Sequence, residues 1–107
     1  MTKHLACYVI TGLLLFTCDS FAVAQDSGAE LYQSKCQMCH AADGSGNTPA
    51  GKAMKARPFN SPDVVKESDT DLIAVIKKGK NKMPAFEGKI TDAQIATLIA
   101  HIRTLQK

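Results

Sequence analysis

The strongest hydrophobic pattern lies near the C-terminus and predicts an amphipathic helix from residue 91 to about Leu105. Within this stretch, isoleucine and leucine recur at positions i, i+3, i+4 and i+7, which places them on one face of a helix. The positions are Ile95, Leu98, Ile99 and Ile102. Residues 91–94 read Thr-Asp-Ala-Gln, a capping box in which the first and last side chains satisfy free backbone N–H groups.

Two further stretches have helical character. Residues 68–71 (Ser-Asp-Thr-Asp) form a good helix start, because acidic side chains stabilise the positive end of the helix dipole. An apolar face follows at Leu72, Ile73, Val75 and Ile76. Lys77, Lys78 and Gly79 then provide a fitting helix end. The stretch from Gly28 to about Cys39 contains no proline and consists mostly of residues that tolerate a helix.

The segments between these helices are rich in helix breakers and are predicted to be loops. Residues 43–47 (Asp-Gly-Ser-Gly-Asn) and residues 79–89, with glycines and Pro84, have this composition. Residues 48–62 contain several prolines and are predicted to wrap loosely, with a short helical turn near residues 52–56. No alternating strand pattern is found. The sequence therefore predicts an all-α fold of three main helices and one or two short ones, in one domain.

Residues 1–24 are predicted to be a signal peptide and not part of this fold. Lys3 gives a positive start, and residues 5–16 form a mostly apolar run. This run is too short to span a membrane, which takes about 20 residues. Ala22-Val23-Ala24 then matches the A-x-A cleavage pattern, so the mature domain is predicted to be residues 25–107.

Cleavage after Ala24 predicts a secreted, periplasmic protein. The alternative is a lipoprotein signal with Cys18 as the lipid site, although Thr17 is a poor match to the small residue that usually precedes such a cysteine. Membrane association is expected only with lipidation of Cys18 or with an uncleaved signal.

Without the leader, two cysteines remain, and Cys36, Cys39 and His40 form a C-x-x-C-H motif. Two thiols at this spacing on a helical turn can each add to one vinyl group of a haem, and the adjacent imidazole can then bind the iron. This is the attachment motif for c-type haem. Three alternatives stay open: a zinc half-site, which needs further ligands, a thioredoxin-like redox pair, which belongs in a βαβ context, and a plain disulfide.

A second iron ligand is expected from the loop before the last helix. Met83 is followed by Pro84, which would stiffen the backbone beside the sulfur donor. Histidine with methionine ligation raises the reduction potential of haem. Met38 lies within the attachment turn, and Met54 is expected to pack its side chain against the core. His101 on the last helix is the competing ligand, although a surface or partly buried role suits its position at the edge of the apolar stripe.

At this point the chain resembles the class I c-type cytochromes, particularly small bacterial ones such as cytochromes c551, c553 and c6, over essentially all of residues 28–107. The resemblance rests on Gly28-x-x-x-Tyr32-x-x-x-Cys36-x-x-Cys39-His40, on Lys82-Met83-Pro84-Ala85-Phe86, and on the final Ile102-Arg103-Thr104-Leu105. It implies the class I fold wrapped around one haem c, covalently bound through Cys36 and Cys39, with His40 and Met83 as the iron ligands.

The resemblance also implies roles for other residues. Gly28 and Tyr32 match the small and aromatic positions where the first helix crosses the last. The carbonyl of Pro49 would accept a hydrogen bond from Nδ1 of His40, which would orient the imidazole.

Three further residues are expected near the haem. Arg57 would reach a haem propionate. Phe59 and Phe86 would pack on or near the ring, with ordinary core packing as the alternative.

These features predict a single-electron carrier and not an enzyme. The leading hypothesis is a diffusible periplasmic electron shuttle, and we expect this shuttle to be a monomer. The alternative is a haem c electron-transfer subunit of a larger dehydrogenase or oxidase. A third class, a haem sensor or ligand-binding cytochrome, would need an open sixth coordination position.

Charge gives a weaker indication of partners. The formal net charge of the chain is +3, and lysines gather around residues 79–89, the loop that contains Met83 and is called the methionine loop below. They are Lys77, Lys78, Lys80, Lys82 and Lys89. Such a cluster could steer an acidic redox partner, although a solvated face with scattered lysines is an equal alternative. Nothing in the pattern indicates nucleic-acid binding.

Overall fold

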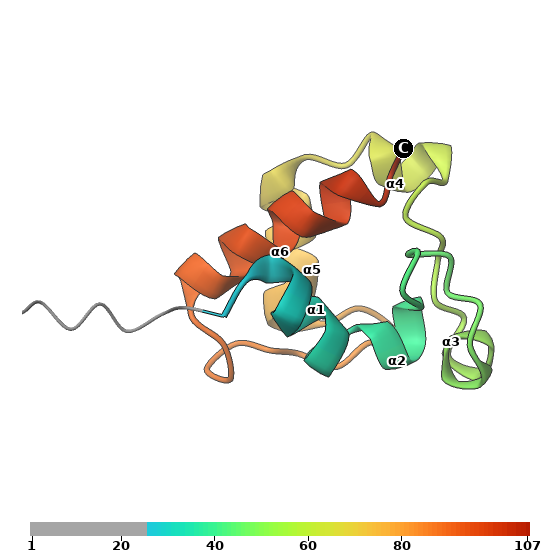
Figure 1. Cartoon of the computed structure of the whole chain (residues 1–107), viewed down its shortest axis with the longest axis horizontal. Helices are drawn as coiled ribbons and strands as arrows, with labels where there is room; N and C mark the ends of the chain where they lie inside the picture. Colours follow the sequence, from blue (N-terminus) through green and yellow to red (C-terminus); the bar gives the residue numbers. More distant parts are fainter. Residues whose placement is uncertain (1–25) are drawn as a thin grey trace, which may run out of the picture.

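The computed structural model describes residues 26–107, which form six helical segments and no β-strand (Figure 1). The segments are α1 (Gly28–Lys35), α2 (Gln37–His40), α3 (Pro49–Met54), α4 (Pro62–Val65), α5 (Asp69–Lys78) and α6 (Asp92–Thr104). The all-α prediction is confirmed, with α1, α5 and α6 as the expected main helices. In this part of the chain no helix is long and apolar enough to cross a membrane. The predicted signal peptide, residues 1–24 with Cys18, lies outside the described residues.

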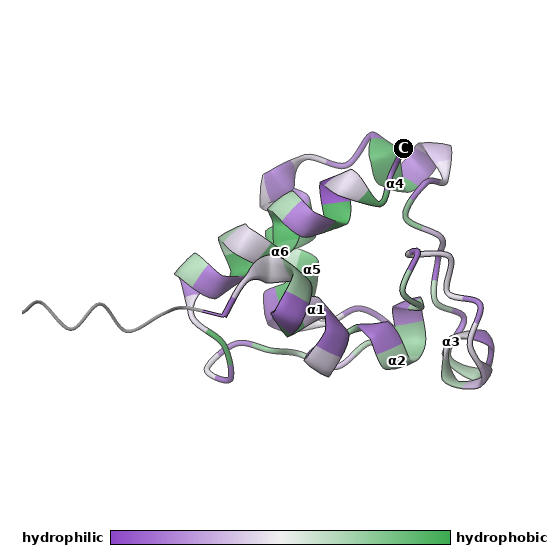
Figure 2. Ribbon diagram, viewed as in Figure 1, coloured by the Kyte–Doolittle hydropathy of each residue, from purple (hydrophilic) through white to green (hydrophobic). Residues whose placement is uncertain are grey.

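Helix α6 organises the core because both other main helices pack against it. Its predicted apolar stripe, Ile95, Leu98, Ile99 and Ile102, is buried. Figure 2 shows apolar and polar residues alternating around α6, as expected for a helix with one buried face. Leu31 and Tyr32 of α1 and Leu72 and Ile76 of α5 complete the same cluster. The short helices α2, α3 and α4 lie at one side of this three-helix unit (Figure 1).

The crossing of α1 and α6 depends on a residue without a side chain. A Cβ atom at Gly28 would lie 2.1 Å from the backbone oxygen of Thr97 and 3.3 Å from Cβ of His101. Glycine therefore allows the two backbones to come close. One turn later the ring of Tyr32 packs on His101, with centroids 5.0 Å apart. The predicted placement of Gly28 and Tyr32 at this crossing is confirmed.

Capping boxes begin α1 and α6. The predicted box at Thr91 is present, since its backbone N–H donates to Gln94 Oε1 at 2.8 Å and its hydroxyl accepts from Gln94 N–H at 3.1 Å. Ser27 and Glu30 form the same arrangement before α1. These reciprocal bonds satisfy backbone donors that have no partner inside the helix.

Helix boundaries differ from the sequence prediction in the first half of the domain. The expected single helix from Gly28 to Cys39 is interrupted at Cys36, where φ is −120°. Two short helices begin at Pro49 and Pro62 within the segment that was predicted to be mostly loop. Proline suits the first position of a helix, because no hydrogen bond from its nitrogen is needed there. The predicted short turn near residues 52–56 overlaps α3, which begins earlier, at Pro49, whereas the helix at Pro62 was not predicted.

Candidate haem-binding site

A cavity of about 630 Å³ lies among α2, α3, α5, α6 and the loop before α6. This volume falls within the range of about 300–1,000 Å³ typical of small-molecule and cofactor sites. Much of its wall is apolar, with contributions from Phe59, Val64, Leu72, Ile76, Phe86 and Leu98. The site therefore suits a large, mostly apolar group with polar contacts at its edges.

The attachment motif forms one wall of this cavity. Cys36, Cys39 and His40 all line it, and a hydrogen bond of 2.9 Å from His40 N–H to the Cys36 carbonyl closes the single turn that carries them. Both cysteines are free thiols, so the disulfide alternative has no support. Burial raises the pKa of the Cys36 thiol to about 11. The two sulfur atoms and the imidazole thus come from one short helical segment, as the motif predicts.

The imidazole of His40 lies against Phe59, with ring centroids 4.7 Å apart and planes 27° apart. Burial lowers the pKa of His40, which favours the neutral imidazole that binds metal ions. Its Nδ1 atom is buried without a hydrogen-bond partner. The expected bond to the carbonyl of Pro49 is therefore not formed. Pro49 is the first residue of α3, where a carbonyl is directed along the helix to the N–H four residues later.

A residue that sequence reasoning missed connects α3 to the attachment turn. The hydroxyl of Thr48 donates to the Met38 carbonyl at 2.7 Å and accepts from the N–H of Gly51 at 2.8 Å. A Cβ atom at Gly51 would meet the carbonyl oxygen of Cys39 at 2.2 Å, so α3 packs directly on this turn. The available signal was a threonine just before a proline, which is typical of an N-cap followed by the first helical residue.

Met83 lines the cavity from the loop between α5 and α6 and is partly buried against the core. Two backbone hydrogen bonds between Lys80 and Met83, of 2.9 and 3.2 Å, close a tight turn at this point. Asn81 within the turn has φ of 54°, in the left-handed region. Gly79 also lets the loop fold back, because a Cβ there would lie 2.5 Å from the Met83 carbonyl oxygen. The backbone of Met83 is thus held in place.

The other candidate ligands are arranged less favourably. Met54 also lines the cavity, but it is 48% exposed, so the prediction that it packs against the core was wrong. It lies at the C-terminal end of the short helix α3, away from the cluster of buried residues. Met38 is 77% exposed. His101 does not line the cavity and packs instead on Tyr32.

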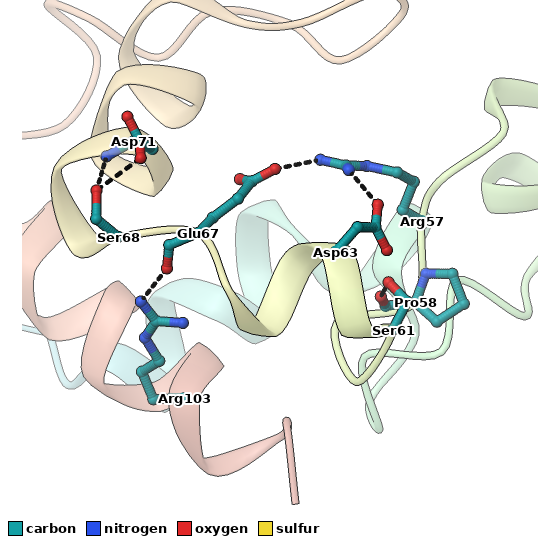
Figure 3. Close-up of polar contacts among 8 residues, drawn as sticks. All are labelled: Arg57, Pro58, Ser61, Asp63, Glu67, Ser68, Asp71 and Arg103. Atoms are coloured by element: carbon teal, nitrogen blue, oxygen red, sulfur yellow. Dashed lines mark hydrogen bonds and ion pairs between the residues drawn. The ribbon is translucent and has the colours of Figure 1, made fainter.

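Arg57 lines the cavity, as expected for a group that contacts a propionate, but two carboxylates already bind its guanidinium. Nη1 donates to Asp63 at 2.7 Å and Nη2 to Glu67 at 3.1 Å (Figure 3). These contacts raise the pKa of Arg57, with the hydrogen bond to Glu67 as the largest cause. Glu67 itself lines the cavity and was missed by the sequence analysis.

The predicted lysine cluster divides into residues that line the cavity and residues, Lys78 among them, that do not. Lys80 and Lys82 line the cavity. Lys77 instead forms an ion pair with Asp92 at 2.8 Å, and Nζ of Lys89 lies 6.0 Å from the centroid of the Phe86 ring. Two lysines outside the predicted cluster, Lys35 and Lys55, also line the cavity. The basic residues at the cavity therefore come from three separate parts of the sequence.

The residues present fit a haem. The cavity combines a large apolar wall, two free thiols, a partly buried imidazole, a thioether and an arginine at its margin. Within residues 26–107, no group of three or more His, Cys, Asp or Glu side chains is placed to bind a metal ion by itself, so a zinc site has no further ligands there.

Comparisons with known proteins agree with this geometry. A family model described as cytochrome c oxidase, cbb3-type, subunit III matches residues 23–102. Cytochrome c6 of Nostoc sp. (strain PCC 7120 / SAG 25.82 / UTEX 2576) is 34% identical over 94% of this chain and 91% of its own length. Cytochrome c6 of Thermosynechococcus vestitus is 34% identical over 83% of this chain and 79% of its own length.

The fold is likewise similar to a solved structure. The c-type cytochrome KustC0563 superposes with a TM-score of 0.70 and 31% sequence identity, covering 77% of this chain and 100% of that protein. The chain belongs to the c-type cytochrome family and is a class I c-type cytochrome. Its cofactor is covalently bound haem c, and it is an electron carrier rather than an enzyme.

Proposed function

We propose that this cytochrome is a periplasmic single-electron carrier whose haem is attached through Cys36 and Cys39 and ligated by His40 and Met83. The observation that carries the proposal is the convergence of these four side chains on one cavity. The two cysteines and the histidine approach it from α2, whereas the methionine approaches from a loop more than forty residues later.

Haem c supplies reversible one-electron chemistry at its iron. Around it, the protein keeps the environment constant between the two oxidation states. The rigid turn from Lys80 to Met83 presents the thioether, and the packing of His40 on Phe59 orients the imidazole. The apolar wall excludes water, which disfavours the additional charge of the oxidised state and raises the potential.

The periplasmic location is supported by the predicted signal peptide, residues 1–24, with its A-x-A pattern at Ala22 to Ala24. We further propose that the carrier is a monomer in solution and that its partners are redox proteins.

We propose that partners dock at the margin of the cavity. Lys35, Lys55, Lys80 and Lys82 line it, and each is exposed. The exposed side chains of Met38 and Met54 lie among them. Apolar contact surrounded by positive charge favours a partner that presents an acidic rim, and it favours fast association that weakens with salt. Lys77, by contrast, forms an ion pair with Asp92, and the ammonium group of Lys89 lies over the ring of Phe86.

The ligand assignment is tested by Met83→Ala in protein matured with a haem-attachment system. The wild-type visible spectrum should be that of low-spin haem that survives acid-acetone extraction, with a methionine-to-iron band in the oxidised state. In Met83→Ala this band should disappear and the reduction potential should fall, because the thioether that favours ferrous iron is lost. The reduced variant should bind carbon monoxide, and the reduced wild type should not.

Met54→Ala is the matched control, because Met54 also lines the cavity and lies outside the attachment turn. It should keep the methionine-to-iron band and a potential near that of wild type. Loss of the band in Met54→Ala, with its retention in Met83→Ala, would reverse the assignment of the sixth ligand. Tight carbon monoxide binding by the native reduced protein would support a ligand-binding cytochrome instead.

A second candidate function is a haem c subunit of a larger oxidase complex, because the matching family model is described by the name of such a subunit. Isolation from the native membrane and periplasmic fractions separates the two. A carrier should elute as a monomer from the soluble fraction, whereas a subunit should co-purify with a catalytic partner.

A further inference from the structure

Glu67 connects the cavity to the helical core through two different groups. Its side chain accepts a hydrogen bond from Arg57 Nη2 at 3.1 Å, and its backbone carbonyl accepts one from Arg103 Nη2 at 2.8 Å (Figure 3). Arg103 belongs to α6 and also binds Asp69 at the start of α5, with Nη2 2.7 Å from Oδ1. Glu67 therefore lies where α4, α5 and α6 meet.

The position of this carboxylate is restricted from both sides. Glu67 N–H donates to the Val64 carbonyl at 3.1 Å, and the next residue, Ser68, caps α5. Together with the bond from Arg103, these contacts hold the Glu67 backbone between α4 and α5. Its side chain can then hold the Arg57 guanidinium at the cavity wall.

Glu67 differs from the other acidic residues of this network in its burial. Its side chain is 22% exposed, compared with 62% for Asp63 and 64% for Asp69. Among the described residues it is also the one carboxylate that lines the cavity. A charge with little solvent around it is screened less and acts over a longer distance than an exposed charge.

We propose that Glu67 is a positioning residue that holds Arg57 at the haem cavity and that its negative charge lowers the reduction potential of the haem. The inference rests on the proposed attachment of haem in this cavity and does not depend on the identity of the sixth ligand. A nearby negative charge stabilises the oxidised state, which carries one more positive charge than the reduced state. Glu67 partly offsets the positive charge of Arg57, which acts in the opposite direction.

The test is the midpoint potential of the holoprotein with Glu67→Gln. Removing the charge should raise the potential, since glutamine retains a similar shape without the negative charge. Asp63→Asn is the matched control: it removes the same charge from the same arginine at a position that is exposed and does not line the cavity. The upward shift should be clearly larger for Glu67→Gln than for Asp63→Asn. A potential that is unchanged, lowered or raised no more than in the control overturns the proposal.

The sign of the shift separates this role from a merely structural one. Loosening of the cavity would admit water and lower the potential, whereas loss of the Glu67 charge raises it. The methionine-to-iron band, measured in the same samples, should persist in Glu67→Gln, so that failure of the ligand assignment remains distinguishable from failure of this inference.

Arg57→Gln removes the positive charge of the pair, and its midpoint potential gives a second test if Glu67→Gln yields no holoprotein. Without the arginine the carboxylate is left unpaired, and the potential should fall. In Arg57→Gln with Glu67→Gln, the two shifts should largely cancel. A potential of the double variant equal to that of Arg57→Gln would overturn the proposal, because removal of the Glu67 charge would then have no effect on the haem.

Discussion

At the scale of single residues, the haem-attachment turn is held by contacts that the C-x-x-C-H motif does not contain. The hydroxyl of Thr48 donates to the carbonyl of Met38 at 2.7 Å and caps α3 through Gly51 N–H. One hydroxyl therefore serves two elements, the turn that bears the cysteines and the helix beside it. Gly51 allows this contact, because any side chain there would collide with the Cys39 carbonyl.

Thr48→Val should lower the free energy of unfolding of the holoprotein by about 1–2 kcal/mol, as expected for loss of an N-cap hydroxyl. Valine keeps the shape of threonine but can neither accept from Gly51 nor donate to Met38. Thr48→Ser keeps the hydroxyl and should remain within about 0.5 kcal/mol of wild type. Denaturant unfolding followed by haem absorbance measures both. Equal losses in the two variants would show that the hydroxyl is not responsible.

At the scale of elements, α1 and α6 form the part of the fold on which the site is built. Tyr32 of α1 packs on His101 of α6, and its hydroxyl donates to the carbonyl of Ala41, next to His40, at 2.6 Å. Burial raises the pKa of Tyr32, so the hydroxyl stays protonated and able to donate. The helix crossing is thereby connected directly to the residue that follows His40.

Gly28→Ala should destabilise the protein even though alanine favours helix formation. Its Cβ would meet the Thr97 carbonyl, so the two helices would have to separate. Overpacking of this kind costs about 1–3 kcal/mol. Gln33→Ala, at an exposed position of the same helix, should change stability by less than about 0.5 kcal/mol. Thermal unfolding compares the variants, and a Gly28→Ala protein as stable as wild type would refute close packing at this crossing.

At the scale of the whole molecule, charge is distributed unevenly around the cavity. Lys35, Lys55, Lys80 and Lys82 line it from α1, α3 and the methionine loop, whereas Glu67 is the one carboxylate there among the described residues. Nζ of Lys82 also donates a hydrogen bond to the carbonyl of Ala53 in α3 at 3.4 Å. A positive field around the redox centre should attract anionic reaction partners.

Lys80→Glu should therefore slow oxidation of the reduced protein by ferricyanide, an anionic reagent, several-fold at low salt. The effect should shrink as ionic strength rises, because the Debye length is about 10 Å at 0.1 M and shorter at higher salt. Lys78→Glu is the matched control, since Lys78 is exposed in the same sequence cluster but does not line the cavity. Stopped-flow absorbance measures the rates. Equal slowing by the two variants would mean that only net charge matters.

Local patterns predicted most of the elements correctly, and the errors have a common origin. The capping box and apolar stripe located α6, and the acidic start and glycine end located α5, because these signals lie within one helix. The start of α3 at Pro49 was placed too late and the helix at Pro62 was missed, because a proline can either break a helix or begin one. Which occurs depends on contacts from elsewhere, such as that of Thr48 with the attachment turn.

By itself, the sequence determined that Cys36, Cys39 and His40 share one turn, because they lie within five residues of each other. Only the tertiary structure decided which distant groups share the cavity. Glu67, Lys35 and Lys55 line the cavity, although no local pattern placed them there. Met54 is exposed, and Nδ1 of His40 has no hydrogen bond to the carbonyl of Pro49. The physical reason is that a motif encodes contacts along the chain, whereas contacts such as those of α6 with α1 and α5, or of α3 with α2, arise only when distant elements pack together.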